Sequence, residues 1–213
     1  MSSDLKLATR WPTSKVRRCL RRRDRAGLLQ FLRQRHEERF FKPIRLLKKA
    51  PANIQGYGFA MMAICALLVE TIQSYRDGLP TTYGSELNRL KRMTRVPLPY
   101  RIPSSLEING KKTFQRFFTV NAELFPGLGG ARFYKNIRNG ILHQGQTKAG
   151  WVLRKWGPDD CSAKGKVIFR DNFADQLERA FGEYIAQLQK RSWDHKLWTH
   201  AARKIWWLAR LSQ

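Results

Sequence analysis

The chain has 213 residues, with 41 Lys and Arg against 16 Asp and Glu, and therefore a formal net charge of +25. Hydrophobic residues make up 42% of the chain and aromatic residues 12%, which allows a sizeable core and excludes a wholly disordered protein. The charge predicts a polyanionic partner, and nucleic acid fits better than an acidic membrane surface. The cysteines Cys19, Cys65 and Cys161 share no metal-ligand spacing and cannot all pair, so we expect a reducing, cytoplasmic location.

The charge is concentrated at the two ends of the chain. Residues 1–50 hold 16 basic and 4 acidic residues, and residues 190–213 hold 6 basic and 1 acidic residue. This pattern predicts three parts: a basic N-terminal helical arm over 1–50, a helical bundle over 51–190, and a basic, Trp-rich C-terminal helix over 191–213.

Apolar residues at spacings near three and four predict that the N-terminal arm is helical. They are Val16, Leu20, Leu28, Phe31, Leu32 and Phe40. An arginine cluster lies between them, formed by Arg17, Arg18, Arg21, Arg22, Arg23 and Arg25. A solvated arm would explain the arginine cluster, but this density of charge favours contact with nucleic-acid phosphates. His36, between charged neighbours, is expected on a solvated face.

The central part opens with a strong helix over 59–76 that is apolar on most sides. A helix that spans a membrane needs about 20 apolar residues. The best candidate for such a helix runs only from Phe59 to Val69, so a buried core helix is the better interpretation. Asp77, Gly78 and Pro80 predict its end. A shorter helix is expected over 86–94, followed by an extended, proline-rich connection.

Further helices are expected over 112–125, 131–143 and 172–188, and a tail over 193–211 carries four tryptophans. The β-prone runs 151–153 and 166–169 predict a hairpin between the last two core helices. For the tail we expect packing first, an interfacial amphipathic helix second and base stacking third. The predicted fold is mainly α: a helical bundle with a small β-hairpin insertion and basic helical extensions at both ends.

The residues that suit chemistry lie on the helix over 131–143. Asn139 and His143 are four residues apart and share a face, whereas Arg138 lies about 140° from His143 at roughly 100° per residue. The long arginine side chain can bridge part of this gap, or a second copy of the chain can supply the other half. A histidine can move the protons of RNA cleavage, and a guanidinium can stabilise the charge on phosphorus. A salt-bridged Arg138 and a packed or capping His143 would explain the same residues structurally.

The run Arg138-Asn139-Gly140-Ile141-Leu142-His143 resembles the signature of the HEPN superfamily. The helix over 59–76, with Glu70 near its end, resembles the long apolar helix that often carries an acidic residue there. The resemblance implies a HEPN-like helical bundle and a homodimer with a shared ribonuclease cleft. It implies catalytic roles for Arg138, Asn139, His143 and, more loosely, Glu70, with no metal and no cofactor.

The resemblance also suggests the biological setting. Many members are toxins or anti-phage effectors that cleave RNA, so a cognate antitoxin or regulatory protein is a further expected partner. Two alternatives stay open: a catalytically silent HEPN-like module that binds nucleic acid, and a basic peripheral membrane protein. We do not expect a membrane partner.

Overall fold

The computed structural model describes residues 4–49, 56–82, 84–158 and 162–211. The protein is mainly α-helical, with two small β-sheets. The described residues form two compact units. Unit 1 is built from Met1–Arg39, Ser74–Asn109 and Tyr184–Gln213, and unit 2 from Phe40–Gln73 and Gly110–Glu183. The division of the chain into three parts at residues 50 and 190 was inferred from the distribution of charge, and it stays a prediction.

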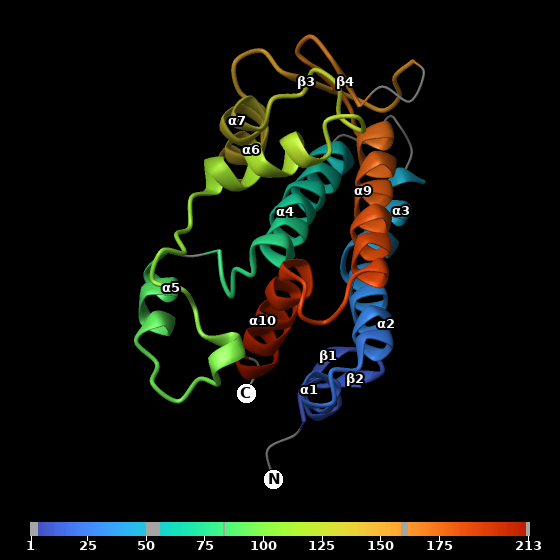
Figure 1. The fold of residues 1–213 in the computed structure, drawn as a ribbon. Coiled ribbons are helices and arrows are strands. Elements are labelled where there is room, and N and C mark those ends of the chain that lie inside the picture. Colours follow the sequence, from blue (N-terminus) through green and yellow to red (C-terminus); the bar gives the residue numbers. More distant parts are fainter. Residues whose placement is uncertain (1–3, 50–55, 83, 159–161, 212–213) are drawn as a thin grey trace. The chain divides into compact units, whose positions relative to one another are not determined.

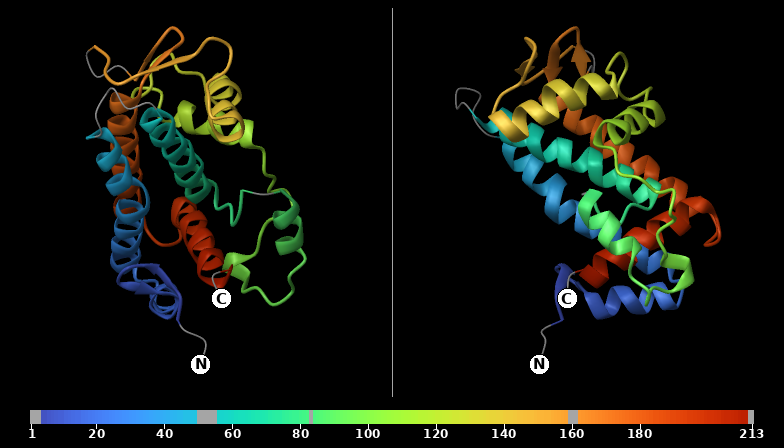
Figure 2. Two further views of the ribbon diagram at one scale, coloured as in Figure 1. Left: turned by 180° about the vertical axis from the view of Figure 1, so that it is seen from behind. Right: turned by 90° about the vertical axis from the view of Figure 1, so that its left-hand side faces the viewer.

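Unit 1 contains the N-terminal elements, the proline-rich connection and the C-terminal helix. Its elements are β1 (Lys6–Ala8), β2 (Trp11–Pro12), α1 (Thr13–Arg21), α2 (Arg25–His36), α5 (Gly84–Lys91), the 3-10 helix η2 (Leu98–Tyr100) and α10 (Lys196–Leu211). The long helices α4 (Tyr57–Asp77) and α9 (Arg170–Lys190) end in this unit, and the π-helical turn η1 (Glu37–Phe41) leaves it. Figure 2 shows α4 in teal and α9 in orange.

The predicted N-terminal helix is confirmed, but it is broken into α1 and α2. Arg23 has a positive φ of 53° between the two helices, a conformation that L-residues other than glycine rarely adopt. Asp24 then caps α2, because its carboxylate accepts the backbone N–H of Gly27 at 2.9 Å. Val16, Leu28 and Phe31 are fully buried, as their spacing predicts.

The expectation that His36 lies on a solvated face is wrong. The side chain is 0% exposed, and its ring lies 5.5 Å from that of Tyr75. Its Nδ1 lies 2.8 Å from the carbonyl oxygen of Leu32, one turn earlier in α2. Burial lowers the pKa of His36 from its ordinary 6.5 to about 3. His36 is therefore a buried, neutral residue, although its neighbours Arg35 and Glu37 are charged.

The tryptophans of the tail pack within unit 1, which confirms the first of their three expected roles for Trp198 and Trp207. Both are 0% exposed. The indole N–H of Trp198 donates to the Leu188 carbonyl at 2.7 Å, and that of Trp207 donates to the Tyr100 carbonyl at 3.0 Å. These bonds satisfy the polar ends of two buried indoles and fix α10 within its unit.

Unit 2 holds most of α4 and α9 together with the shorter central elements. These are α3 (Lys42–Lys48), α6 (Gly110–Val120), α7 (Gly130–Phe133), the π-helical turn η3 (Tyr134–Arg138), α8 (Asn139–Gln144), β3 (Val152–Arg154), β4 (Ala163–Lys164) and β5 (Val167–Phe169). Helices α6 and α7 lie against each other (Figure 1). A phenylalanine cluster fills the interior, with ring centroids 5.2 to 5.7 Å apart for Phe114, Phe125, Phe133 and Phe173.

Helix α4 matches the prediction of a long apolar helix, and Gly78 ends it with a positive φ of 67°. It is the one described helix that is long and apolar enough to cross a membrane by length and composition. Just over half of its most apolar window, 56%, is buried inside the protein. Cys65, Leu68 and Val69 are among its fully buried residues, which favours a core helix.

The small sheet of unit 2 corrects the predicted hairpin. The two β-prone runs do form strands, but β3 pairs with β5 in parallel, with Val152 opposite Val167. The antiparallel partner of β5 is β4, which the sequence analysis missed. Gly165, with a positive φ of 60°, allows the tight turn between β4 and β5. Since β4 occupies one edge of β5, β3 pairs with the other.

Candidate active site

The candidate site lies on a continuous helical stretch from Gly130 to Gln144 in unit 2. A π-helical turn over Tyr134–Arg138 separates α7 from α8. Such turns are rare and often occur at functional sites. Gly130 allows a close approach to α6, because a Cβ there would lie 2.4 Å from the Phe114 carbonyl oxygen. Phe133, Ile137 and Ile141 point to the interior and are at most 7% exposed.

The end of α8 is fixed by two glycines. Gly145 caps the helix with a φ of 68°, and its N–H donates to the Ile141 carbonyl at 3.1 Å. The following loop folds back so closely that a Cβ at Gly140 would lie 2.4 Å from the Gln146 carbonyl oxygen. The backbone N–H of Lys148 then donates to the Asn136 carbonyl of the π-helical turn at 2.8 Å. These contacts hold the helix that carries Arg138 and His143 in one conformation.

Arg138 is the centre of the site. Its Nη2 donates to Glu70 Oε1 of α4 at 3.4 Å, in an ion pair whose side chains are 20% and 11% exposed. Its Nη1 lies 3.2 Å from Asn139 Oδ1 and 3.4 Å from His143 Nε2. The structure therefore brings together all four residues that the sequence analysis assigned to catalysis.

The long arginine side chain closes the gap between Arg138 and His143 within one chain. The backbone spacing predicts that they diverge by about 140°, and the 3.4 Å contact between Nη1 and Nε2 shows that the side chain bridges this angle. In this contact the imidazole Nε2 can accept a hydrogen bond only when it carries no proton. A second subunit is thus not required to bring the two groups together.

Burial differs across the site. Glu70 is 8% exposed, whereas His143 lies on the exposed side of α8. The Nε atom of Arg138 is buried and has no hydrogen-bond partner among the described residues. The guanidinium thus lies between a buried carboxylate and an exposed imidazole, so one side is fixed and the other faces solvent.

Tyr134 is a further residue of the site, which the sequence analysis did not identify. Its ring centroid lies 5.6 Å from the guanidinium carbon of Arg138, at cation–π distance. Gly110 of α6 packs beside it, since a Cβ there would lie 2.8 Å from the tyrosine hydroxyl oxygen. The spacing of four residues between Tyr134 and Arg138 on one helix is the signal that could have indicated the contact.

The arginine cluster of the N-terminal arm belongs to unit 1, and its members fall into two groups. Arg17 donates to the Ala209 carbonyl at 2.9 Å, Arg25 donates to the Arg191 carbonyl, and Arg23 lies 3.7 Å from Asp194. No such contact engages Arg18, Arg21 or Arg22 among the described residues. The second group is exposed and can meet phosphates without losing a contact.

The remaining histidines and cysteines have structural surroundings. His195 Nδ1 accepts the Leu197 N–H at 3.1 Å, and His200 Nδ1 lies 2.5 Å from the Arg76 carbonyl oxygen. Cys19 and Cys65 are free and buried, and Cys161 lies outside the described residues. Across residues 4–49, 56–82, 84–158 and 162–211, no three His, Cys, Asp or Glu gather in a way that could hold a metal ion.

The four catalytic candidates combine a proton-transfer group with a charge-stabilising group. An exposed imidazole beside a guanidinium can exchange a proton with a hydroxyl, and the guanidinium can bind the oxygens of a phosphate. The chain matches no protein-family model, no curated protein and no solved structure, so these comparisons assign no function to the site.

Proposed function

We propose that the protein is a metal-independent endoribonuclease of the HEPN type that acts as a toxin or anti-phage effector in the cytoplasm. The observation that carries the proposal is the contact of one half-buried guanidinium, Arg138, with a carboxylate, an amide and an imidazole. A guanidinium and an imidazole side by side are the two groups that cleavage of an RNA phosphodiester needs in the absence of a metal.

In the proposed reaction the ribose 2′-OH attacks the adjacent phosphorus. His143 takes the proton of the 2′-OH while water protonates the departing 5′-oxygen, or it protonates the 5′-oxygen while water takes the proton of the 2′-OH. The P–O5′ bond breaks as the P–O2′ bond forms, which yields a 2′,3′-cyclic phosphate and a 5′-hydroxyl. Arg138 donates to the non-bridging oxygens as negative charge grows on them.

Glu70 acts as a positioning residue in this mechanism. Its carboxylate holds Nη2 of Arg138 at 3.4 Å and is itself almost fully buried. Nη1 can then exchange its long 3.4 Å contact with His143 for a phosphate oxygen. Asn139, at 3.2 Å from the same Nη1, can orient the guanidinium or the phosphate.

Cleavage of RNA in the presence of EDTA tests the proposal. We expect products with 2′,3′-cyclic phosphate ends, and His143→Ala should lower the rate by about 10²–10⁴, the usual contribution of a positioned proton-transfer group. His195→Ala is the matched control, because His195 is also exposed but lies in the C-terminal segment of unit 1. A strict requirement for magnesium or manganese would exclude the mechanism.

The proposal includes a two-fold homodimer with RNA in a shared cleft. The support is the family resemblance and the frequency of symmetric dimers, not the position of Arg138, which already reaches His143 in its own chain. Mixing Arg138→Ala and His143→Ala proteins shows whether the working pair of Arg138 and His143 lies within one chain or between two chains. A pair formed between chains should restore about a quarter of wild-type activity on free exchange of subunits in two-fold dimers. A pair within one chain should restore nothing.

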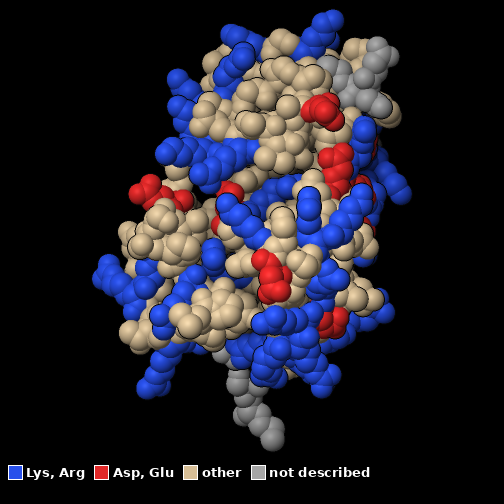
Figure 3. Space-filling view, in the orientation of Figure 1, with Lys and Arg blue, Asp and Glu red and all other residues tan. Residues whose placement is uncertain are grey.

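A catalytically silent nucleic-acid-binding module is the second candidate, and the charge distribution favours it. Lys and Arg cover much of the face shown in Figure 3, whereas Asp and Glu appear in a few separate places. This surface can bind RNA whether or not Arg138 and His143 perform chemistry. Salt-sensitive binding of RNA that stays intact, and is unaffected by His143→Ala, would establish this function instead.

A further inference from the structure

A hollow in unit 1 shares no residue with the proposed active site, which belongs to unit 2, and its lining combines apolar and cationic residues. Its volume is about 290 Å³, near the lower limit for small-molecule pockets. The lining comes from the end of α5, the proline-rich connection and α10. The residues are Leu90, Lys91, Arg92, Met93, Thr94, Val96, Arg101, Ile102 and Trp207.

The floor of the hollow is apolar and fixed. Leu90, Val96 and Trp207 form a cluster with exposures of 1%, 5% and 0%, and Met93 and Ile102 pack against it. The indole N–H of Trp207 is already bonded to the Tyr100 carbonyl at 3.0 Å. The floor therefore closes the hollow without needing a polar partner, and the apolar surface open to a ligand is that of the half-buried Met93 and Ile102.

The rim is cationic. Lys91, Arg92 and Arg101 line the hollow, and no carboxylate does. The chain from Leu87 to Arg101 also contains Arg89 and Arg95 and has no acidic residue. An anion with an apolar body is the ligand that such a floor and rim would bind.

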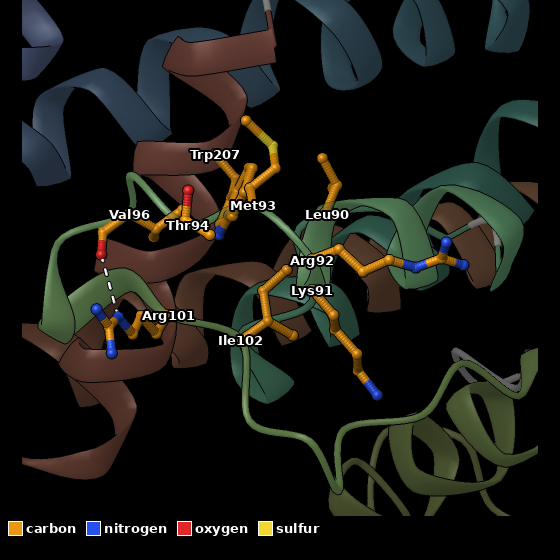
Figure 4. Close-up of a pocket in the computed structure, with 9 residues that line it drawn as sticks. All are labelled: Leu90, Lys91, Arg92, Met93, Thr94, Val96, Arg101, Ile102 and Trp207. Atoms are coloured by element: carbon orange, nitrogen blue, oxygen red, sulfur yellow. Dashed lines mark hydrogen bonds between the residues drawn. The ribbon is translucent and has the colours of Figure 1, made fainter.

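The positions of the cations distinguish between two such anions. Figure 4 shows Arg101 on one side of the apolar residues and Lys91 and Arg92 on the other. A fatty acid carries one charged head and needs cations at one end only. A nucleotide within an RNA strand carries a phosphate before and after its base, which matches cations on both sides.

The side chains of the rim keep donors for a ligand. Arg101 uses only its Nε, which donates to the Val96 carbonyl at 3.2 Å. Lys91 donates one hydrogen bond, to the Ser104 carbonyl at 2.7 Å, and an ammonium group has three donors. The side chain of Arg92 is exposed and makes no hydrogen bond or ion pair within the described part of the chain.

We infer that this hollow is an RNA-binding subsite: it takes one unstacked base of a single strand against Met93 and Ile102, over the floor that Trp207 closes, and Lys91, Arg92 and Arg101 bind the flanking phosphates. The inference rests on RNA as the partner in the proposed function, but not on cleavage. It adds a preference for single-stranded substrate, because a base within a duplex is stacked and paired.

Binding of a short single-stranded RNA and of the same strand without bases tests the subsite. Full-length His143→Ala protein is used so that the RNA stays intact. The strand with bases should bind about 5-fold more tightly, the lower end of the range for one stacked base, because the base packs on Met93 and Ile102 and not on an open aromatic ring. Met93→Trp should fill the hollow and abolish most of this difference, and Ile102→Trp should do the same from the opposite wall if Met93→Trp fails to fold.

The rim is tested by salt dependence. Arg92→Gln with Arg101→Gln should reduce the slope of log K against log salt by about 1.4, at about 0.7 per single-strand phosphate contact, with the base-dependent difference retained. Arg95→Gln is the matched control, because Arg95 is exposed on the same segment but does not line the hollow. It should change the slope by less than either rim arginine.

Several outcomes would overturn the inference. Equal affinity of the His143→Ala protein for the two strands would show that no base enters the hollow. A difference in affinity that stays the same in Met93→Trp and Ile102→Trp would show this too. Uptake of decanoate that Met93→Trp abolishes, with RNA binding unaffected, would assign the hollow to a single-headed anion. Loss of cleavage alone would contradict the proposed function and leave the subsite standing, because the binding assay needs no chemistry.

Discussion

Two regions of the molecule place arginine and histidine on helices, and they differ in which of the two is buried. Around α8, Arg138 is largely buried against Glu70 and His143 is exposed. In α1 and α2, Arg18, Arg21, Arg25 and Arg33 are exposed, whereas His36 is fully buried. A buried guanidinium with an exposed imidazole suits a reaction on a bound anion, whereas a buried neutral imidazole suits packing. Burial, not residue type, therefore separates the two roles.

Among the variants that test this comparison of buried and exposed residues, Arg138→Lys should have the largest effect. Arg138→Lys should lower RNA cleavage by about 10²–10³, because an ammonium group cannot meet Glu70, Asn139 and a phosphate with the geometry of a guanidinium. Single-turnover cleavage measures the loss. Arg132→Lys is the control, since Arg132 is exposed on α7 in the same helical stretch and should keep its activity. Equal losses in both variants would remove the distinction between the buried and exposed arginines.

The second prediction concerns His36 and pH. Burial lowers its pKa to about 3, so the folded protein keeps the imidazole neutral where the unfolded chain binds a proton, below about pH 6.5. Acid therefore favours unfolding, and the free energy of unfolding should fall from this residue with a limiting slope of about 1.4 kcal/mol per pH unit, or by about 2.3 kcal/mol from pH 6.5 to 4.5. The contribution is fully present only well above pH 6.5, where the unfolded imidazole is neutral too.

Denaturant unfolding at several pH values checks this prediction. His36→Gln removes the proton uptake, so its stability should depend less on pH over the same window than that of the parent protein. His195→Gln serves for comparison, because His195 is exposed. Parallel pH profiles for the parent and His36→Gln would mean that His36 does not behave as a buried neutral residue.

The third prediction separates the two groups within the arginine cluster. Replacing Arg18, Arg21 and Arg22 by Gln should reduce the slope of log K for RNA against log salt by about 2, at about 0.7 per contact, with little change in stability. Replacing Arg17, Arg23 and Arg25 should instead lower the thermal midpoint, because Arg17 and Arg25 donate to backbone carbonyls. Filter binding and thermal unfolding of the two triple variants distinguish these effects. An unchanged slope in the first triple would show that the N-terminal arm does not bind RNA.

The smallest effect is expected at Arg23, whose φ of 53° favours glycine. Arg23→Gly should stabilise the protein by about 0.5–1 kcal/mol, the relief of left-handed strain less the added freedom of the unfolded chain. The lost pairing with Asp194 costs little, since both side chains are well exposed. A lower free energy of unfolding, measured with denaturant, would instead give Arg23 a structural role.

Local patterns in the sequence predicted most of the helices and the membership of the candidate site. The apolar spacing placed the core residues of α1, α2 and α4, and Gly78 marked the end of α4. Spacing along the chain also grouped Arg138, Asn139 and His143. These features depend on neighbours within a few residues of one another in the sequence, so they can be predicted without knowledge of the fold.

Features that depend on distant parts of the chain could not be predicted in the same way. The contact of Arg138 with Glu70 joins residues 68 positions apart, and only the resemblance suggested the carboxylate. The parallel pairing of β3 with β5 depends on the short strand β4, whose Ala163 and Lys164 give no β signal. His36 was misplaced because a charged local sequence does not reveal that Tyr75 covers the ring.

The π-helical turn over Tyr134–Arg138 has a consequence for how this sequence tolerates change in length. A turn closed from i to i+5 contains one residue more than an α-turn. Because either kind of turn closes about 360°, deleting one residue there would restore a regular helix and leave the residues after it facing nearly the same side as before. Deleting one residue from α8 instead, between Arg138 and His143, would rotate His143 by about 100° relative to Arg138. The turn therefore acts as an inserted spacer, and the chain should tolerate a one-residue deletion within it better than one in the regular helix that follows.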